Sequence, residues 1–158
     1  MSLKKLLKKS PEKILFICTG NTCRSPMAAA MAAEIFAQAG HTIEVSSAGV
    51  SAWANQPASR HAIAVMKEAG LCLAAHKAAL VSQNLLDSAT LVLTMTSTHR
   101  AVLLSDYPSA KSKIFTLGEY VGDKADISDP FGGSEEIYRA CAAQIRAMLA
   151  LAAKKLKE

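Results

Sequence analysis

One short segment limits the folds open to this chain more than any other, because it joins a fully apolar run to a polar loop and then to a helical pattern. Residues 14–17 are all apolar, as expected for a strand that is buried on both faces of a parallel sheet. The polar loop at 18–25 follows, and apolar side chains then recur at helical spacing as far as Ile35. The segment predicts a strand, a loop and a helix, with Ser25 as the helix N-cap and Pro26 in the first turn.

The rest of the chain continues this alternation of short apolar runs with longer helical patterns, which is typical of β-α-β units around a parallel sheet. Further strands are expected at residues 43–47, 91–95 and 113–116, and helices near 57–69, 97–105 and 134–156. Gly40 is expected to end the first helix. We predict an α/β fold, a three-layer sandwich in which a four-stranded parallel sheet is flanked by helices. Ligands bind such sheets beyond the carboxyl ends of the strands, where the loop at 18–25 would lie.

The formal net charge is +5, but the excess of basic side chains lies at the two ends of the chain. Residues 1–12 hold four lysines and one glutamate, and residues 151–158 hold three lysines and one glutamate. Residues 13–150 are balanced, with 11 basic and 11 acidic side chains. Because nucleic-acid binders carry a basic face on their folded body, we expect no nucleic-acid partner. The pattern indicates a basic N-terminal extension at 1–12 and a single domain at 13–158.

Signals for membrane insertion, export and metal binding are weak. No apolar run approaches the roughly 18 residues of a membrane-spanning helix, and the N-terminal stretch lacks the apolar core of a signal peptide. The cysteines have neither the spacing of a secreted disulfide scaffold nor that of a zinc site; they are Cys18, Cys23, Cys72 and Cys141. We expect a cytoplasmic protein without a metal or a membrane partner, as a monomer or a weak dimer.

The loop from Cys18 to Ser25 has the composition of an anion-binding cradle. Five residues separate Cys18 from Arg24, so the backbone can curl with its N–H groups inward, while the following helix adds the positive end of its dipole. Gly20 and Asn21 suit the left-handed backbone that such a curl requires. The cradle would stabilise a Cys18 thiolate. Arg24 would offer a planar fork to two phosphoryl oxygens, and the Ser25 hydroxyl could bond the Cys18 sulfur.

The run from Ile17 to Pro26 resembles the signature of the low-molecular-weight protein tyrosine phosphatases. Supporting matches are the Ser-Ser-Ala-Gly run at 46–49, His76 and the Asp-Pro-Phe-Gly-Gly run at 129–133. The resemblance extends from about residue 13 to 156. It implies that the domain at 13–158 is a phosphatase domain that hydrolyses phosphorylated protein side chains through a phosphocysteine intermediate. It also implies no cofactor, a phosphorylated protein as substrate and inorganic phosphate as product.

The resemblance assigns roles to individual residues. Cys18 is the expected nucleophile, Arg24 the side chain that stabilises the transferred phosphoryl group, and Asp129 the acid that protonates the leaving group. In the second step Asp129 would take a proton from the water that hydrolyses the phosphocysteine. Ser47 and His76 would brace the loop behind the site. Substrate-binding positions are expected at Thr19, Gly20, Asn21, Thr22, Cys23, Ser25, Trp53 and Phe131.

The remaining histidines and cysteines have plainer interpretations. We expect His61 and His99 to face solvent or to cap a helix. Cys72 and Cys141 are expected in the core. A thioredoxin-coupled arsenate reductase, a related enzyme, would need two further cysteines after the second helix, and only Cys72 lies near there. Arsenate reduction is therefore the weaker alternative.

Thr22 bears on which phosphorylated side chain is attacked. Tyrosine phosphatases of this family usually carry a bulky aliphatic residue there, whereas the relatives that dephosphorylate arginine carry threonine, with Phe-Gly-Gly after the Asp-Pro pair. This chain has both features. A small polar side chain can admit a planar cation and its water, and Asp129 can orient a guanidinium through paired hydrogen bonds. We expect a protein arginine phosphatase, with a tyrosine phosphatase of the same mechanism as the alternative.

Cys23 follows Cys18 by five positions in the same curled loop. Such a pair can form a disulfide when the thiolate is oxidised. The spacing predicts reversible oxidative inactivation, against the simpler interpretation of Cys23 as a small buried residue.

Overall fold

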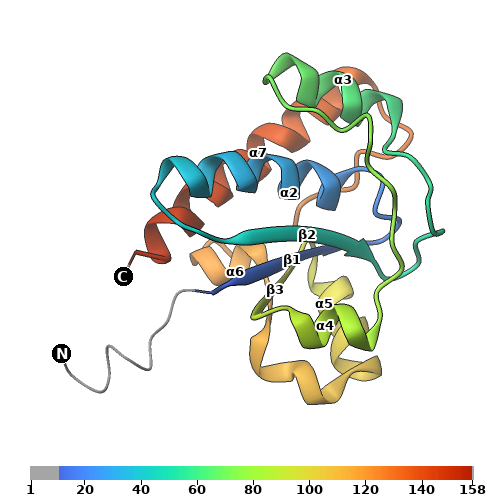
Figure 1. The fold of residues 1–158 in the computed structure, drawn as a ribbon. Helices are drawn as coiled ribbons and strands as arrows, with labels where there is room; N and C mark the ends of the chain where they lie inside the picture. The colour runs from blue at the N-terminus through green and yellow to red at the C-terminus, as the bar shows by residue number, and fades with distance from the viewer. Residues whose placement is uncertain (1–10, 158) are drawn as a thin grey trace.

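The computed structural model describes residues 11–157 of the chain and is built around one parallel sheet (Figure 1). The sheet has four strands in the order β2-β1-β3-β4. The strands are β1 (Lys13–Cys18), β2 (Glu44–Gly49), β3 (Leu91–Thr94) and β4 (Ile114–Thr116). All four expected strands are confirmed, and their pairings are parallel. Most of the expected basic extension at 1–12 lies outside the described residues.

Helices cover both faces of the sheet. In Figure 1, α2 and α7 lie against one face with α3 beyond them, and α4 and α5 lie on the other side. The predicted three-layer arrangement is therefore confirmed. The helices are α2 (Arg24–Gln38), α3 (Arg60–Glu68), α4 (Gln83–Ser88), α5 (Ser97–Asp106), α6 (Leu117–Val121) and α7 (Glu135–Lys155), with a 3-10 helix, η1 (Pro108–Lys113).

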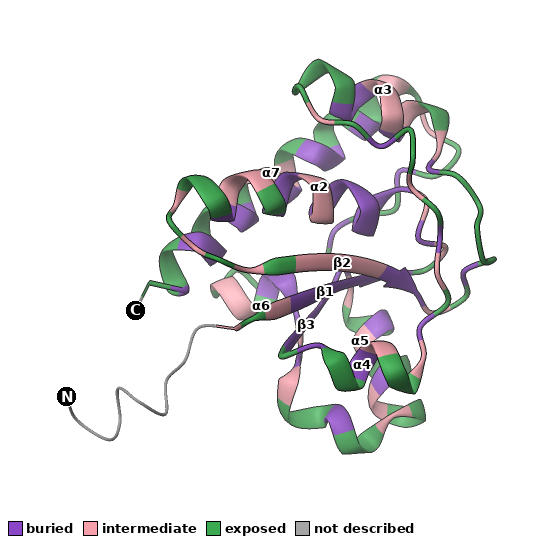
Figure 2. Ribbon diagram, viewed as in Figure 1, coloured by how far each residue is buried: buried purple, intermediate pink, exposed green. Residues whose placement is uncertain are grey.

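Alternate side chains of β1 enter two separate hydrophobic cores. Ile14 and Phe16 pack in the core with α2 and α7, while Leu15 and Ile17 pack in the core on the opposite face. Both faces of this strand are therefore buried, as Figure 2 shows. The burial explains why the run at 14–17 is apolar at every position, since a parallel strand covered on both sides has no solvent face.

The strand register places the loop after β1 at the carboxyl edge of the sheet. Cys18 pairs with Gly49 of β2, and Ile17 pairs with Thr94 of β3. Helix α2 begins at Arg24 with Cys23 as its N-cap, and this cap makes no side-chain hydrogen bond. The prediction that Ser25 is the N-cap was therefore wrong. The Ser25 hydroxyl lies inside the first turn and bonds the loop instead.

The structure differs from the sequence prediction mainly in its short elements. Helices α4 and α6 and the 3-10 helix η1 were not predicted, because five or six residues are too few to show an apolar period. Helix α3 begins three residues later than expected, since Ser59 caps it by accepting a hydrogen bond from the Ala62 N–H. Within residues 11–157, no helix is both long and apolar enough to cross a membrane.

Candidate active site

A cavity of about 290 Å³ lies at the carboxyl end of β1. It is formed by the loop that follows this strand and by the segment that precedes α7. Eight of its lining residues were predicted site residues; the ninth, Gln56, was not, because no motif marks the loop before α3. The lining residues are Cys18, Thr19, Gly20, Thr22, Cys23, Arg24, Gln56, Asp129 and Phe131.

Cys18 lies at the bottom of the loop, at the end of β1 and close to the start of α2. Its side chain is buried, and its Sγ lies 2.9 Å from Oγ of Ser25. The Asn21 side-chain amide donates to the same Ser25 oxygen over 2.8 Å, and the Ser25 hydroxyl can donate its own proton to the sulfur or, over 3.4 Å, to the Ala48 carbonyl. A sulfur in this position can be stabilised as a thiolate by the hydroxyl and by the positive end of the helix dipole.

Asn21 holds the loop in shape from behind. Its backbone is left-handed, with φ of 56°, as predicted. Its side chain also donates to Ser47 Oγ over 2.9 Å and accepts from the Ala79 N–H over 2.9 Å. The Asn21 carbonyl accepts from His76 Nε2 over 2.7 Å. The structure therefore places Ser47 and His76 where they were expected, in contact with Asn21.

Two glycines near the loop have different roles from each other. The left-handed backbone expected at Gly20 was wrong, since positive φ angles in this loop are confined to Asn21. The loop turns at Asn21 instead, where the hydrogen bonds of the side-chain amide offset the cost of the left-handed backbone. Gly49, at the end of β2, is tightly enclosed: a Cβ there would lie 2.4 Å from the Thr19 carbonyl oxygen and 2.9 Å from the Asn21 nitrogen. The loop therefore packs directly on the backbone of β2.

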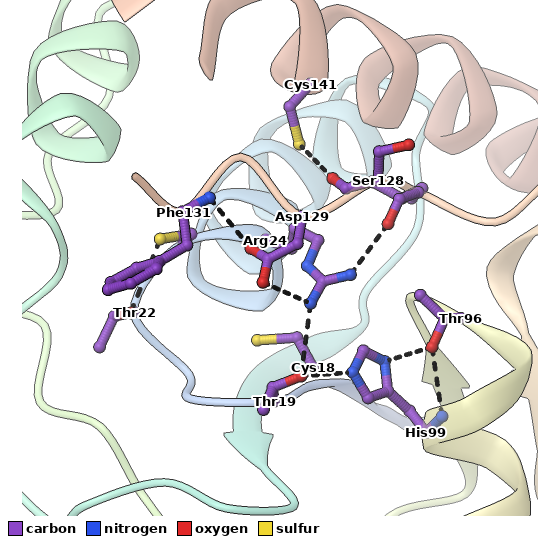
Figure 3. A network of polar contacts seen from close by, with 12 residues as sticks. Cys18, Thr19, Thr22, Arg24, Thr96, His99, Ser128, Asp129, Phe131 and Cys141 are labelled. Carbon is purple, nitrogen blue, oxygen red and sulfur yellow. Dashed lines mark hydrogen bonds and ion pairs between the residues drawn. The ribbon is translucent and has the colours of Figure 1, made fainter. Parts of the chain in front are cut away.

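Arg24 is buried and its guanidinium is held at both terminal nitrogens. One, Nη1, donates to the Ile127 carbonyl over 2.9 Å. The other, Nη2, donates to Thr19 Oγ1 over 3.4 Å and forms an ion pair with Asp129 at 3.6 Å. Figure 3 shows these contacts converging beside Cys18. The guanidinium can thus present a fixed planar edge to an anion above the sulfur.

Asp129 reaches the cavity from the segment before α7. Its Oδ1 accepts a hydrogen bond from the Phe131 N–H over 3.1 Å, and its side chain is 53% exposed. A carboxyl group held in this way can exchange protons with a group in the cavity and with water. Phe131 stands exposed at the rim. Trp53 is also exposed and does not line the cavity, so its role in binding stays a prediction.

Cys23 is largely buried and lies beside a tyrosine. Its Sγ lies 3.2 Å from the Tyr138 hydroxyl and 3.4 Å from Ser59 Oγ. Burial, together with the hydrogen bond to Cys23, raises the pKa of Tyr138 to about 12. The Tyr138 hydroxyl therefore stays protonated over the physiological range and can donate to the Cys23 sulfur.

The other two cysteines fall in different environments. Cys141 is buried in the core, as expected, and burial raises the pKa of its thiol to about 11. The expectation for Cys72 was wrong, because this residue is exposed in the loop after α3. The apolar pattern around it does not continue as a helix beyond Gly70, whose φ of 78° ends α3.

His99 was expected at the surface or as a cap, and this expectation was wrong. Its side chain is buried, with Nε2 2.8 Å from Thr19 Oγ1 and Nδ1 3.0 Å from Thr96 Oγ1 (Figure 3). Burial lowers the pKa of His99 to about 4, and the positive charge of Arg24 acts in the same direction. His61 is half-buried and packs against the ring of Tyr138. No pattern in the sequence predicts this position of His99, because its contact with Thr19 joins two segments that follow different strands of the sheet.

Comparison with known proteins shows what the chain as a whole is similar to. The family model described as low molecular weight phosphotyrosine protein phosphatase matches residues 13–158. A protein-arginine-phosphatase from Geobacillus stearothermophilus is 45% identical over 148 residues, covering 93% of this chain and 97% of that protein. The low molecular weight protein-tyrosine-phosphatase PtpB of Staphylococcus epidermidis is 36% identical over 126 residues, covering 80% and 86%.

A solved structure adds a chemical observation. It is a mutant of the YwlE arginine phosphatase with a phosphorylated active-site serine. It superposes with a TM-score of 0.90 at 41% identity, and the match covers 92% of this chain and 96% of that one. In that relative, a phosphoryl group is therefore carried on an active-site side chain.

Proposed function

The chain belongs to the low-molecular-weight phosphotyrosine protein phosphatase family, and we propose that its substrates are proteins phosphorylated on arginine. The observation that carries this proposal is Thr22, whose small polar side chain lies on the cavity wall beside Cys18. The identity of 45% with a protein-arginine-phosphatase over nearly the whole chain supports it.

In the proposed first step, the Cys18 thiolate attacks the phosphorus atom of phosphoarginine. The S–P bond forms as the P–N bond breaks, and the leaving guanidine nitrogen takes a proton from Asp129. Arg24 and the N–H groups of the loop stabilise the charge on the transferred oxygens. The Arg24 guanidinium is already held beside Cys18, so little reorganisation accompanies the step.

In the second step, water attacks the phosphocysteine. Asp129, now a carboxylate, accepts a proton from this water as the S–P bond breaks. The products are inorganic phosphate and the Cys18 thiolate, which the Ser25 hydroxyl at 2.9 Å can stabilise as a leaving group. Atoms and charges therefore balance without any cofactor.

Substrate choice is proposed to depend on Thr22. A guanidinium is planar and charged and retains water, so it is better accommodated by a hydroxyl-bearing wall than by a branched hydrocarbon. A phenyl ring gains more from an aliphatic wall, because apolar surface is then buried on both sides. Phe131 and Gln56, two exposed residues that line the cavity, complete the surface that the substrate side chain would meet.

Thr22→Ile is the test of this preference. We expect the ratio of kcat/KM for phosphoarginine proteins to that for phosphotyrosine proteins to fall by about 10-fold or more. Discrimination of this size is typical when an apolar pocket meets a polar substrate group in other enzymes. Thr22→Ser, which keeps the hydroxyl, is the matched control and should retain the wild-type ratio. An unchanged ratio in Thr22→Ile would show that this side chain does not choose the substrate.

A tyrosine phosphatase is the second candidate. It is favoured by the similarity to the PtpB protein, which is named a protein-tyrosine-phosphatase. The mechanism would be the same with a phenolate as the leaving group. The wild-type ratio in the experiment above decides between the two, since a tyrosine phosphatase would turn over phosphotyrosine proteins faster.

We also propose that oxidation inactivates the enzyme reversibly. Peroxide would convert the Cys18 thiolate to a sulfenic acid, and the Cys23 sulfur would then displace water to form a disulfide, which a thiol reductant reopens. Both cysteines are free and line the same cavity. Mass spectrometry after peroxide treatment should show a Cys18–Cys23 link, and Cys23→Ser should instead accumulate sulfinic acid at Cys18. Sulfinic acid at Cys18 in the wild type would reject the protective role.

Three further assignments complete the proposal. Residues 13–158 act as one phosphatase domain, which the extent of the family match supports. A reducing, cytoplasmic location suits an enzyme whose nucleophile must remain a free thiol. The substrate-binding role predicted for Trp53 is retained for the protein surface around the phosphorylated side chain, since this residue lies exposed outside the cavity.

A further inference from the structure

His99 is a buried titratable side chain that the mechanism above does not use. It lies on α5, on the opposite side of the sheet from α2, yet its Nε2 is 2.8 Å from Oγ1 of Thr19 in the phosphate-binding loop. Figure 3 shows its ring between Thr19 and Thr96. Capping of α5 does not require this ring, because Thr96 accepts the His99 backbone N–H with its own hydroxyl.

The position of His99 is itself fixed from two sides. On one side, Thr96 Oγ1 contacts both the backbone nitrogen and Nδ1 of His99, at 3.2 and 3.0 Å. On the other, Asp126 accepts hydrogen bonds from the backbone nitrogen and the hydroxyl of Ser97, at 2.9 and 3.1 Å. The first turn of α5 is therefore tied to the segment that carries Asp129. A side chain on this turn is a rigid support rather than a mobile one.

Thr19 connects this support to the catalytic arginine. Arg24 donates from Nη1 to the Ile127 carbonyl and from Nη2 to Thr19 Oγ1. Two contacts on different nitrogens define the plane of a guanidinium. Asp129 also pairs with Nη2, at 3.6 Å, but its side chain is 53% exposed. Thr19 is an exposed residue. Without His99, contact with solvent could therefore change the orientation of its side-chain hydroxyl.

A neutral His99 suits this arrangement. An imidazolium would repel the Arg24 guanidinium, and both burial and that guanidinium hold the pKa of His99 down to about 4. With its proton on Nε2, the ring donates to Thr19 Oγ1 and accepts the Thr96 hydroxyl proton at Nδ1. Thr19 Oγ1 then accepts from both His99 and Arg24. This tautomer gives each of these contacts one donor and one acceptor.

We propose that His99 is a positioning residue for phosphoryl transfer, which fixes the plane of the Arg24 guanidinium through the Thr19 hydroxyl. The inference rests on the proposed function only in that Arg24 must bind the transferred phosphoryl group. It does not depend on whether arginine or tyrosine carries that group. His99 touches neither substrate nor phosphoryl group.

The test is a double-mutant cycle with Thr19→Val and His99→Leu, assayed on an aryl phosphate. Each single variant should lower kcat/KM by about 10-fold, the effect of losing one well-placed hydrogen bond in the transition state. Because the two residues act in series, the double variant should also lose about 10-fold rather than about 100-fold. Competitive inhibition by inorganic phosphate should weaken in parallel, since the same guanidinium edge binds it.

Conservative variants separate positioning from packing. Thr19→Ser keeps the hydroxyl, and His99→Gln keeps a donor near the position of Nε2; both should stay within about 3-fold of the wild type. His41→Leu is the matched control, because His41 Nε2 also makes a hydrogen bond, to the Ala153 backbone carbonyl, but far from the cavity. It should leave kcat/KM and phosphate inhibition unchanged.

Two results would overturn the proposal. Multiplicative losses in the cycle would show that His99 and Thr19 act independently. Wild-type kcat/KM in His99→Leu, with that variant folded at the assay temperature, would show that the ring is not needed. Failure of the proposed arginine preference would appear separately, as faster turnover of phosphotyrosine than of phosphoarginine proteins by the unmodified enzyme. If His99→Leu does not fold, His99→Asn combined with Thr19→Val gives the same comparison, because the shorter amide can keep the contact of Nδ1 with Thr96 but cannot reach Thr19 as Nε2 does.

Discussion

The side chain of Asn21 shows how much of the site depends on single residues. It is fully buried and makes hydrogen bonds to Ser25, Ser47 and the backbone of Ala79. One amide thereby links the nucleophile loop to β2 and to the segment after it. A buried polar network of this kind holds a unique geometry only while all its members are paired.

His99 also leads to a prediction about stability. A histidine in the unfolded chain titrates near 6.5, whereas the pKa of His99 in the folded protein is about 4. As the pH falls from about 6.5 to 4, the unfolded state binds the proton first, so the native state loses stability. At about 1.4 kcal/mol per pKa unit, the loss reaches about 3 kcal/mol. The facing charges are Arg24, which lowers the pKa, and Asp126 and Asp129, which raise it.

His99→Gln isolates this contribution from the titration of the carboxylates. Chemical denaturation at pH 7 and at pH 4 should show the wild type losing more free energy of unfolding than the variant does. The stability difference between the two proteins should therefore shrink on acidification. A difference that stays constant between these pH values would mean that His99 is not held neutral in the folded protein.

Among individual residues, the positions of those in short motifs were predicted better than the positions of those that reach the site from distant segments. Cys18, Arg24 and Asp129 belong to short motifs, so their meeting in one cavity was expected. Gln56 and His99 reach the site only through the folding of distant segments, and no local pattern marks them. The Ser25 hydroxyl was expected both to cap α2 and to bond the Cys18 sulfur; the structure has the bond to the sulfur and not the cap, and Asn21 bonds the same hydroxyl.

At the level of elements, the loop at 18–25 depends on the end of β2. The backbone of Gly49 accepts from the Val81 N–H and pairs with Cys18, so both of its sides are occupied. The loop is therefore supported by a strand that contributes no catalytic group. The Ser-Ser-Ala-Gly run at 46–49 therefore supports the loop in two ways. Gly49 leaves room for the loop backbone, and the Ser47 hydroxyl accepts a hydrogen bond from Asn21.

Gly49→Ala should disturb the loop directly. The new Cβ would lie 2.4 Å from the Thr19 carbonyl oxygen, which is backbone and cannot move aside cheaply. We expect a loss of about 1–3 kcal/mol in the free energy of unfolding, typical of overpacking. A shift of the loop should also lower kcat/KM by about 10-fold or more. Denaturation curves and turnover of an aryl phosphate measure the two effects.

Gly20→Ala is the stability control for this substitution. Its Cβ would have Thr22 Oγ1 as the nearest neighbour, at 3.8 Å, an ordinary contact. Its free energy of unfolding should stay within about 1 kcal/mol of the wild type. If Gly49→Ala were as stable and as active as the wild type, the loop would not rest on β2 in the way described.

The long elements were predicted because each carries a period or a continuous apolar run over enough residues. The strands β1 and β3 and the helices α2 and α7 are of this kind. The short helices α4 and α6 have only one turn or little more, and they form because capping hydrogen bonds and contacts with the sheet select them. Such tertiary selection leaves no periodic signal in the sequence.

On the scale of the whole molecule, the fold brings together segments that are far apart in the chain. The loop at 18–25 follows β1 and is braced by β2 and by His76, while Asp129, the proposed acid, precedes α7. Parallel strands make this possible, since all four carboxyl ends face the same edge. The architecture was therefore predictable from the alternation of elements. The ion pair between Arg24 and Asp129, across this edge, was not.

The central claim is that this molecule transfers a phosphoryl group from protein arginine to Cys18. Rapid quenching of the wild type with an arginine-phosphorylated protein, followed by mass spectrometry of its peptides, tests the claim most directly. We predict one phosphoryl group on the peptide that contains Cys18 within the first turnover. Cys18→Ser should show no sustained release of phosphate. A phosphoryl group on any other residue, or continued phosphate release by Cys18→Ser, would contradict the account.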